Sequence, residues 1–114
     1  VPLSVLGLQP HHQIGVFEAG ISTVNEMVHL QKIIQPTIGI LTNIGEAHDE
    51  GFPNREAKIA EKIKLFKHCT TIFLQKNEAI EALLPSGCHK QTWSFEDESA
   101  AVFVAQKSKK TVPN

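Results

Sequence analysis

Short apolar runs alternate with segments of helical periodicity along the chain, and this alternation is the feature that most constrains its fold. Strand-like runs cover residues 14–17, 37–42, 70–74, 91–95 and 101–105, and helical patterns cover 23–34, 56–66 and 78–84. Strands separated by helices of this length favour βαβ crossovers. We therefore expect an α/β fold with three layers, in which a mainly parallel sheet has helices on both faces.

The helical segments begin and end at recognisable signals. Thr23 and Glu26 form a capping box at the start of the first helix, which has to end before Pro36. The second helix has an apolar face, and its charged side chains lie off that face, namely Lys58, Glu61 and Lys64. The pattern is that of an amphipathic helix.

The composition indicates one globular domain with little net charge. The 114 residues include 11 Lys and Arg against 12 Asp and Glu, a formal net charge of −1, and 41% are hydrophobic. Such a charge gives no electrostatic argument for a nucleic-acid or membrane-surface partner, and no apolar run approaches the length of a membrane span. Cys69 and Cys88 are too few for a disulfide framework, so we expect a reduced, cytoplasmic setting.

The first candidate site follows the apolar run 14–17. Ligands of parallel sheets bind beyond the carboxyl ends of the strands, and a carboxylate such as that of Glu18 suits Mg²⁺. A solvated glutamate at the end of a strand is an equally good interpretation. Gly20 and the Ser22 hydroxyl fit a phosphate contact, and they fit ordinary helix capping as well.

The second candidate site is the loop after the run 37–42. It contains His48 together with Glu46, Asp49 and Glu50, although an isolated histidine in a polar loop is usually a surface residue. Lys62 follows His48 by fourteen residues. From spacing alone, a solvated or snorkelling lysine is the preferred interpretation of Lys62.

Other kinds of site have weaker support. Two Cys–His pairs permit only a loose zinc cluster, formed by His68, Cys69, Cys88 and His89. The pair His11–His12 is expected in a surface turn, and Trp93 and Phe95 are expected in the core, with a base-stacking role for Trp93 as the alternative. Neither a Gly-x-Ser-x-Gly nor a Gly-x-Gly-x-x-Gly motif occurs.

Three ordered blocks of sequence resemble the central ATPase domain of the Mur ligases, which build the cytoplasmic peptidoglycan precursor. They are GVFEAG at 15–20, PTIGILTNIGEAH at 36–48 and AEKIKLF at 60–66. The second block, continued by EGF at 50–52, is most similar to the ligases that add D-alanyl-D-alanine to UDP-N-acetylmuramoyl-tripeptide. The match is good over about residues 1–66 and looser beyond.

The resemblance implies a set of roles for the candidate residues. Glu18 and His48 would hold the Mg²⁺ that accompanies ATP, and Lys62 would take up CO₂ to form a carbamate that joins them. A carbamate converts a cation into an anion, so it can bind a metal that an ammonium repels. Asn43 would lie near the nucleotide or metal, whereas the muramoyl-peptide side would be lined by Gly20, Ile21 and Ser22. The reaction implied is formation of an acyl-phosphate followed by attack of the dipeptide amine.

The family's Gly-x-x-Gly-Lys-Thr loop does not occur in the sequence. The chain also lacks an initial Met, so we expect residues 1–114 to be part of the central domain of a longer protein, without its UDP-binding and carboxyl-terminal domains. Such a piece is expected to be inactive alone and to self-associate through exposed sheet edges. Three alternatives remain: another amino-acid-adding Mur ligase, a ligase that adds glutamate to folate, and a binding module without turnover.

Overall fold

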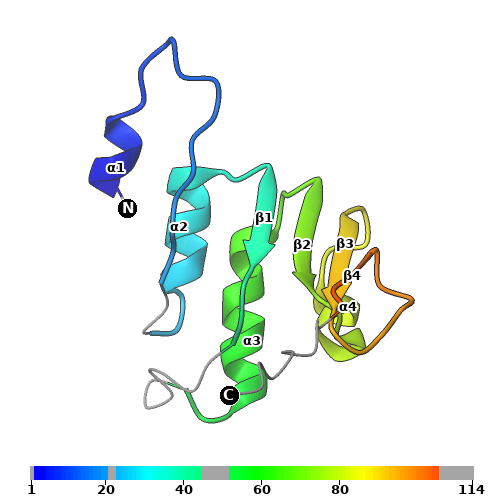
Figure 1. Ribbon diagram of the computed structural model, residues 1–114. Helices are drawn as coiled ribbons and strands as arrows, with labels where there is room; N and C mark the ends of the chain where they lie inside the picture. Colours follow the sequence, from blue (N-terminus) through cyan, green and yellow to red (C-terminus); the bar gives the residue numbers. More distant parts are fainter. Residues whose placement is uncertain (1, 21–22, 45–51, 106–114) are drawn as a thin grey trace, which may run out of the picture.

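The computed structural model describes residues 2–20, 23–44 and 52–105, which form an alternating series of helices and strands (Figure 1). The elements follow in the order α1 (Pro2–Leu6), α2 (Glu26–Ile34), β1 (Ile38–Leu41), α3 (Arg55–Ile63), the 3₁₀ helix η2 (Lys64–Phe66), β2 (Thr71–Gln75), α4 (Glu78–Leu83), β3 (His89–Ser94) and β4 (Val102–Phe103). Every strand-like run of the sequence from residue 37 onward corresponds to a strand. The α/β class with a parallel sheet and intervening helices is confirmed.

The four strands lie in the order β1-β2-β3-β4, and all neighbouring pairs are parallel. Parallel strands that follow one another in space and sequence, joined by right-handed crossovers, place their helices on one face of the sheet. The main core lies between that face and α3, η2 and α4, where Leu41, Ile72 and Leu74 from the strands meet Ile63 and Phe66. Helix α2 packs beside α3 and η2, and α1 contacts α2.

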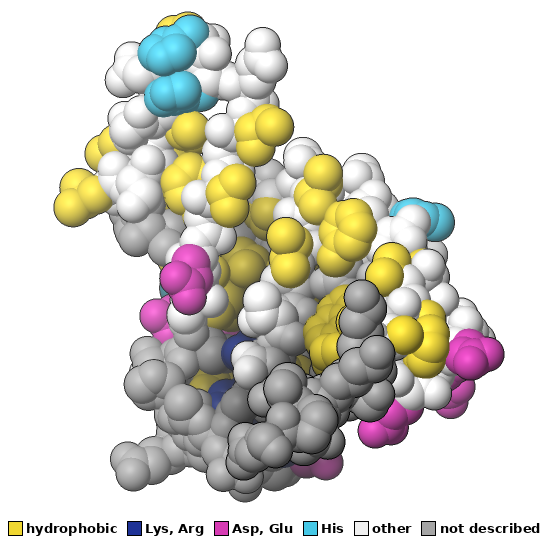
Figure 2. Space-filling model, viewed as in Figure 1, with side chains coloured by type: hydrophobic (Ala, Val, Ile, Leu, Met, Phe, Trp, Pro, Cys, Tyr) yellow, Lys and Arg dark blue, Asp and Glu magenta, His cyan; other side chains and the backbone are white. Residues whose placement is uncertain are grey.

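The opposite face of the sheet is exposed over β1 and β2. Ile38, Ile40 and Phe73 point to this side, because the buried positions of both strands alternate with exposed ones. Figure 2 shows hydrophobic side chains gathered over this face. Among the described residues, no second helical layer covers it. Phe95, expected in the core, is exposed, and its ring meets the half-buried Trp93 edge-on at 5.4 Å between centroids.

The prediction of a buried strand at 14–17 is wrong for this structure. The segment is extended, but it pairs with no strand of the described sheet, and the exposed fractions of Ile14 and Val16 are 80% and 87%. In Figure 1 it runs past α2 instead of lying in the sheet. An apolar run gives a strand only where a neighbouring strand offers hydrogen bonds, and a local pattern cannot supply that neighbour.

Helix α3 buries two of the charged side chains that lie off its apolar face. Lys58 and Glu61 are both only 2% exposed, as deeply buried as the apolar residues of the core. Helix α3 lies between two neighbours, since its apolar face packs on the sheet and another side packs on α2. Glu61 lies on a side that the periodicity marks as polar, and its carboxylate nevertheless meets the Met27 N–H of α2.

The start of α2 follows the capping-box prediction in part. The Glu26 carboxylate accepts a hydrogen bond from the Thr23 backbone N–H at 3.2 Å, as expected. The helix itself begins at Glu26, and Asn25 occupies the N-cap position in a left-handed conformation without a side-chain cap bond. The first amides of α2 therefore need acceptors from elsewhere in the chain.

Candidate functional site

A pocket of about 250 Å³ opens at the carboxyl ends of β1 and β2. Its apolar lining comes from the ends of the two strands and from α4, and its polar lining includes Thr42, Asn43, Arg55, Gln75, Lys76 and Asn77. In parallel sheets this edge also receives the amino ends of the following helices, whose free N–H groups favour anions. The positive charges of Arg55 and Lys76 at the same edge strengthen this preference for anions.

Lys62 reaches this edge from the last turn of α3. Its ammonium Nζ donates a hydrogen bond to the backbone oxygen of Asn43, at 3.3 Å, across 19 residues of sequence. Asn43 itself lines the pocket. The structure thus brings together two of the residues singled out in the sequence, although their spacing alone favours a solvated lysine.

The surroundings of Lys62 disfavour its charged form. Burial lowers the pKa of Lys62 below its ordinary value, and the nearby positive charge of Lys58 lowers it further. A lowered pKa increases the fraction of neutral amine, which is the form that reacts with electrophiles such as CO₂. The amine of Lys62 is therefore neutral more often than that of a solvated lysine.

Glu18 and Gly20 lie on the extended segment before α2. The Glu18 side chain is exposed and, among the described residues, makes no hydrogen bond or ion pair with Asn43 or Lys62. Gly20 is exposed too, and a Cβ built there would meet no atom within 4 Å. The neighbouring Ala19 packs against Met27 and Phe52, so the backbone next to Glu18 is anchored to the protein.

The remaining candidates, His48, Ile21 and Ser22, lie outside the described residues. The two cationic residues of the pocket, Arg55 and Lys76, were not identified from the sequence. Both lie where a strand connects to the following helix, since Arg55 is the first residue of α3 and Lys76 the first after β2. A cation at such a position is the signal that could have identified them.

The zinc alternative finds no support. His68, Cys69, Cys88 and His89 are all described, and the described residues contain no group of three or more potential ligands arranged to hold a metal ion. Both thiols instead lie in the apolar core, where each donates a weak hydrogen bond to a backbone oxygen. His11 and His12 lie in an exposed turn, as predicted.

The donor chemistry of the candidates fits Mg²⁺ under one condition. The exposed carboxylate of Glu18 offers oxygens of the kind that Mg²⁺ binds, whereas an ammonium at Lys62 repels it. Conversion of Lys62 to a carbamate would supply oxygens in place of the cation. The Lys62 side chain already ends at the pocket edge, so the carbamate oxygens would lie beside the pocket.

The sequence matches the model of the Mur ligase middle domain over residues 1–112. The chain therefore belongs to the Mur ligase family. Similar curated proteins are named UDP-N-acetylmuramoyl-tripeptide–D-alanyl-D-alanine ligase. The one from Borreliella burgdorferi is 39% identical over 74 residues, which are 65% of this chain and 16% of the relative. The one from Haemophilus influenzae is 33% identical over 70 residues, 61% of this chain and 15% of the relative.

The relative from Buchnera aphidicola is 28% identical over the whole chain, which spans 24% of that protein. The chain thus spans about a quarter or less of the length of these relatives. No solved structure matches the chain significantly. Within the described residues, no helix has the length and apolar character needed to cross a membrane.

Proposed function

We propose that this chain is part of the central domain of an ATP-dependent amide ligase of the peptidoglycan pathway. The proposed enzyme adds D-alanyl-D-alanine to UDP-N-acetylmuramoyl-tripeptide in the cytoplasm. The relatives with this printed name support the substrate assignment. The observation that carries the proposal is the Lys62–Asn43 hydrogen bond at the edge of a cationic pocket.

The pocket suits the phosphate-bearing substrate of such a reaction. Arg55 and Lys76 line it with two positive charges, and α3, nine residues long, starts at Arg55. The Asn54 side chain accepts a hydrogen bond from the Ala57 N–H at 2.8 Å and fixes that start. Because the cations and the helix end lie at one edge of the sheet, we expect ATP phosphates to bind there.

The metal site would draw on residues from three segments. Glu18, His48 and the Lys62 carbamate would hold Mg²⁺, which supplies charge neutralisation for phosphoryl transfer. The Lys62 ammonium, which donates a hydrogen bond to the backbone oxygen of Asn43, would become an anionic ligand of the metal. Asn43 would contact nucleotide or metal, and Gly20, Ile21 and Ser22 would line the muramoyl-peptide side. In this scheme the protein chiefly positions charged groups.

The test is an assay of the full-length protein that carries this sequence. Release of inorganic phosphate from ATP is measured with UDP-N-acetylmuramoyl-tripeptide and D-alanyl-D-alanine, and separately with folate and glutamate. We expect turnover with the first pair alone. Turnover with folate would replace the proposal by a folate ligase, and turnover with a single amino acid in place of the dipeptide would assign another Mur-type ligase. Nucleotide binding without turnover on any pair would favour the binding module.

We also propose that the 114-residue chain self-associates when it is separated from the rest of such a protein. Ile38, Ile40 and Phe73 form an exposed apolar face, and β1 lies at the edge of the described sheet. An unpaired edge beside an apolar face favours pairing with a second copy. Light scattering of the 114-residue chain at increasing concentration measures this association.

A further inference from the structure

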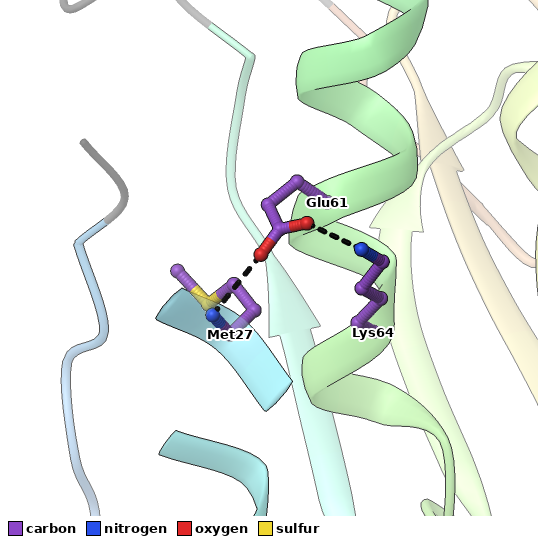
Figure 3. A network of polar contacts seen from close by, with 3 residues as sticks. All are labelled: Met27, Glu61 and Lys64. Carbon is purple, nitrogen blue, oxygen red and sulfur yellow. Dashed lines mark hydrogen bonds and ion pairs between the residues drawn. The ribbon is translucent and has the colours of Figure 1, made fainter. Parts of the chain in front are cut away.

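The buried Glu61 carboxylate joins α3 to the amino end of α2. One oxygen, Oε1, accepts a hydrogen bond from the Met27 backbone N–H at 3.2 Å, and the other, Oε2, accepts one from the Lys64 ammonium at 2.6 Å. Figure 3 shows the carboxylate between the two donors. Glu61 and Met27 are 34 residues apart in the sequence, so this contact exists only in the folded chain.

The Met27 amide is one of the first N–H groups of α2, which have no acceptor within their own helix. Asn25, at the N-cap position, offers no side-chain acceptor bond. Glu61 therefore caps α2 from a neighbouring helix, and its negative charge lies at the helix end where a charge of that sign is favourable. Both partners of this bond are almost fully buried.

The same junction anchors the segment that precedes α2. The Met27 side chain, with Phe52, forms a small buried cluster against which Ala19 and Ala57 pack. Ala19 is the neighbour of Glu18, and Ala57 belongs to α3. Movement of the α2 start would therefore displace the backbone that carries Glu18 relative to α3.

Lys62 follows Glu61 directly on α3, and the two side chains point in different directions. Glu61 points to α2, whereas Lys62 points to the end of β1 and bonds to Asn43. We infer that Glu61 is a positioning residue. It holds the backbone that carries Glu18 at a fixed place relative to Lys62. The inference rests on the proposed roles of Glu18 and Lys62 as joint metal ligands.

The experiment compares three variants of the full-length protein. Glu61→Ala removes the acceptor, Glu61→Gln retains a carbonyl oxygen for the Met27 N–H, and Glu56→Gln is the control, because Glu56 is an exposed residue of the same helix. Two quantities are measured: hydrogen exchange of the peptide containing Met27, without metal or nucleotide, and the Mg²⁺ concentration that gives half-maximal ligation.

We expect Glu61→Ala to speed exchange at the Met27 peptide about tenfold, with no change in peptides from β2 and β3. The half-maximal Mg²⁺ concentration should rise about tenfold or more, as it does when groups that orient metal ligands are lost. In Glu61→Gln, both the exchange rate of the Met27 peptide and the half-maximal Mg²⁺ concentration should stay close to the wild-type values. Glu56→Gln should match the wild type in both. A merely stabilising residue would not shift the Mg²⁺ requirement of the folded fraction.

Normal exchange at Met27, or a normal Mg²⁺ requirement in an active Glu61→Ala enzyme, would overturn the inference and leave the proposed function intact. Faster exchange throughout the chain would also overturn it, since that result would make Glu61 a residue of general stability. If the wild type itself shows no ligation, the proposed function fails. A local exchange effect would then still establish the cap of α2, and the metal-positioning role would be rejected.

Discussion

The Lys62 ammonium donates a hydrogen bond to the backbone oxygen of Asn43, the second residue after β1. The bond spans 3.3 Å and connects the end of α3 with the pocket edge. A helix antiparallel to the preceding strand normally ends far from that strand's carboxyl end, but the long lysine side chain extends back along α3 toward it. Lys62 is therefore directed to the place where parallel sheets bind ligands.

Replacement of Lys62 tests the proposed carbamate. In the full-length protein, Lys62→Ala should lower the ligation rate by about a hundredfold or more, because the site would lose an anionic metal ligand. Ligation by the wild type should also fall when CO₂ and bicarbonate are removed from the buffer. The control is Lys67→Ala, since Lys67 is exposed and outside the pocket. Normal ATP-dependent ligation by Lys62→Ala would reject the carbamate.

The cations of the pocket should contribute to ATP binding by the full-length protein. Arg55→Gln and Lys76→Gln should each raise the Kd for ATP about fivefold, the size expected for partly solvated charge pairs. The effect should shrink with added salt because screening weakens exposed charges. Titration calorimetry at two ionic strengths provides the measurement, with Lys67→Gln as the control. Equal affinities for all three variants would place the phosphates elsewhere.

Gly39 is required by the close packing of β1 against η2. A Cβ at residue 39 would overlap the ring of Phe66, which is buried in the core. Gly39→Ala should therefore lower the free energy of unfolding by about 1–3 kcal/mol. Urea denaturation measures this loss. Gly87→Ala is the matched control, since a Cβ there meets no atom within 4 Å, and it should leave the urea midpoint nearly unchanged.

The thiol of Cys69 should be protected in the native chain. Burial raises its pKa from 9.0 to about 11, and the neighbouring Cys88 raises it too. At pH 8 we expect alkylation by iodoacetamide to be at least about a hundredfold slower than in urea, because the reactive thiolate is scarce. Peptide mapping identifies the modified residue. Equal rates in native and unfolded chains would contradict the burial of this thiol.

The raised pKa of Cys69 also predicts how stability depends on pH. The folded chain holds this proton more tightly than the unfolded chain. The contribution of this thiol to the free energy of unfolding is therefore fully present below about pH 9. It is lost as the pH rises through about 11. Urea midpoints measured between pH 8 and 11 should fall in the wild type. A Cys69→Ala variant should show a smaller fall over the same range.

Self-association can be tested on the chain itself. Light scattering should give an apparent mass that rises with concentration, and Ile40→Lys should reduce it by placing a charge on the exposed sheet face. Leu83→Lys is the control, because Leu83 is also exposed but belongs to α4. A monomer at all concentrations would reject self-association, and an equal effect of both variants would reject the sheet face as its site.

The sequence by itself determined the order and type of most elements. Apolar runs and helix caps depend on residues that are close in the sequence. Pro36 therefore marks the end of one helix and Asn54 the start of another, independently of the tertiary fold. The same local information placed Asn43 in the loop after a strand and Lys62 on the helix that follows. It could not pair them, since the bond between them depends on how far α3 lies from the end of β1.

Only the tertiary structure decided which surfaces are covered. The run 14–17 has the pattern of a buried strand, but its Ile14 and Val16 are exposed. Lys58 and Glu61 have the pattern of a polar helix side, but they are buried. Burial depends on the neighbour that a surface meets, and α2 reaches α3 only after the chain has folded. The Glu61–Met27 bond follows from that contact, because a buried amide at a helix start has to find an acceptor nearby.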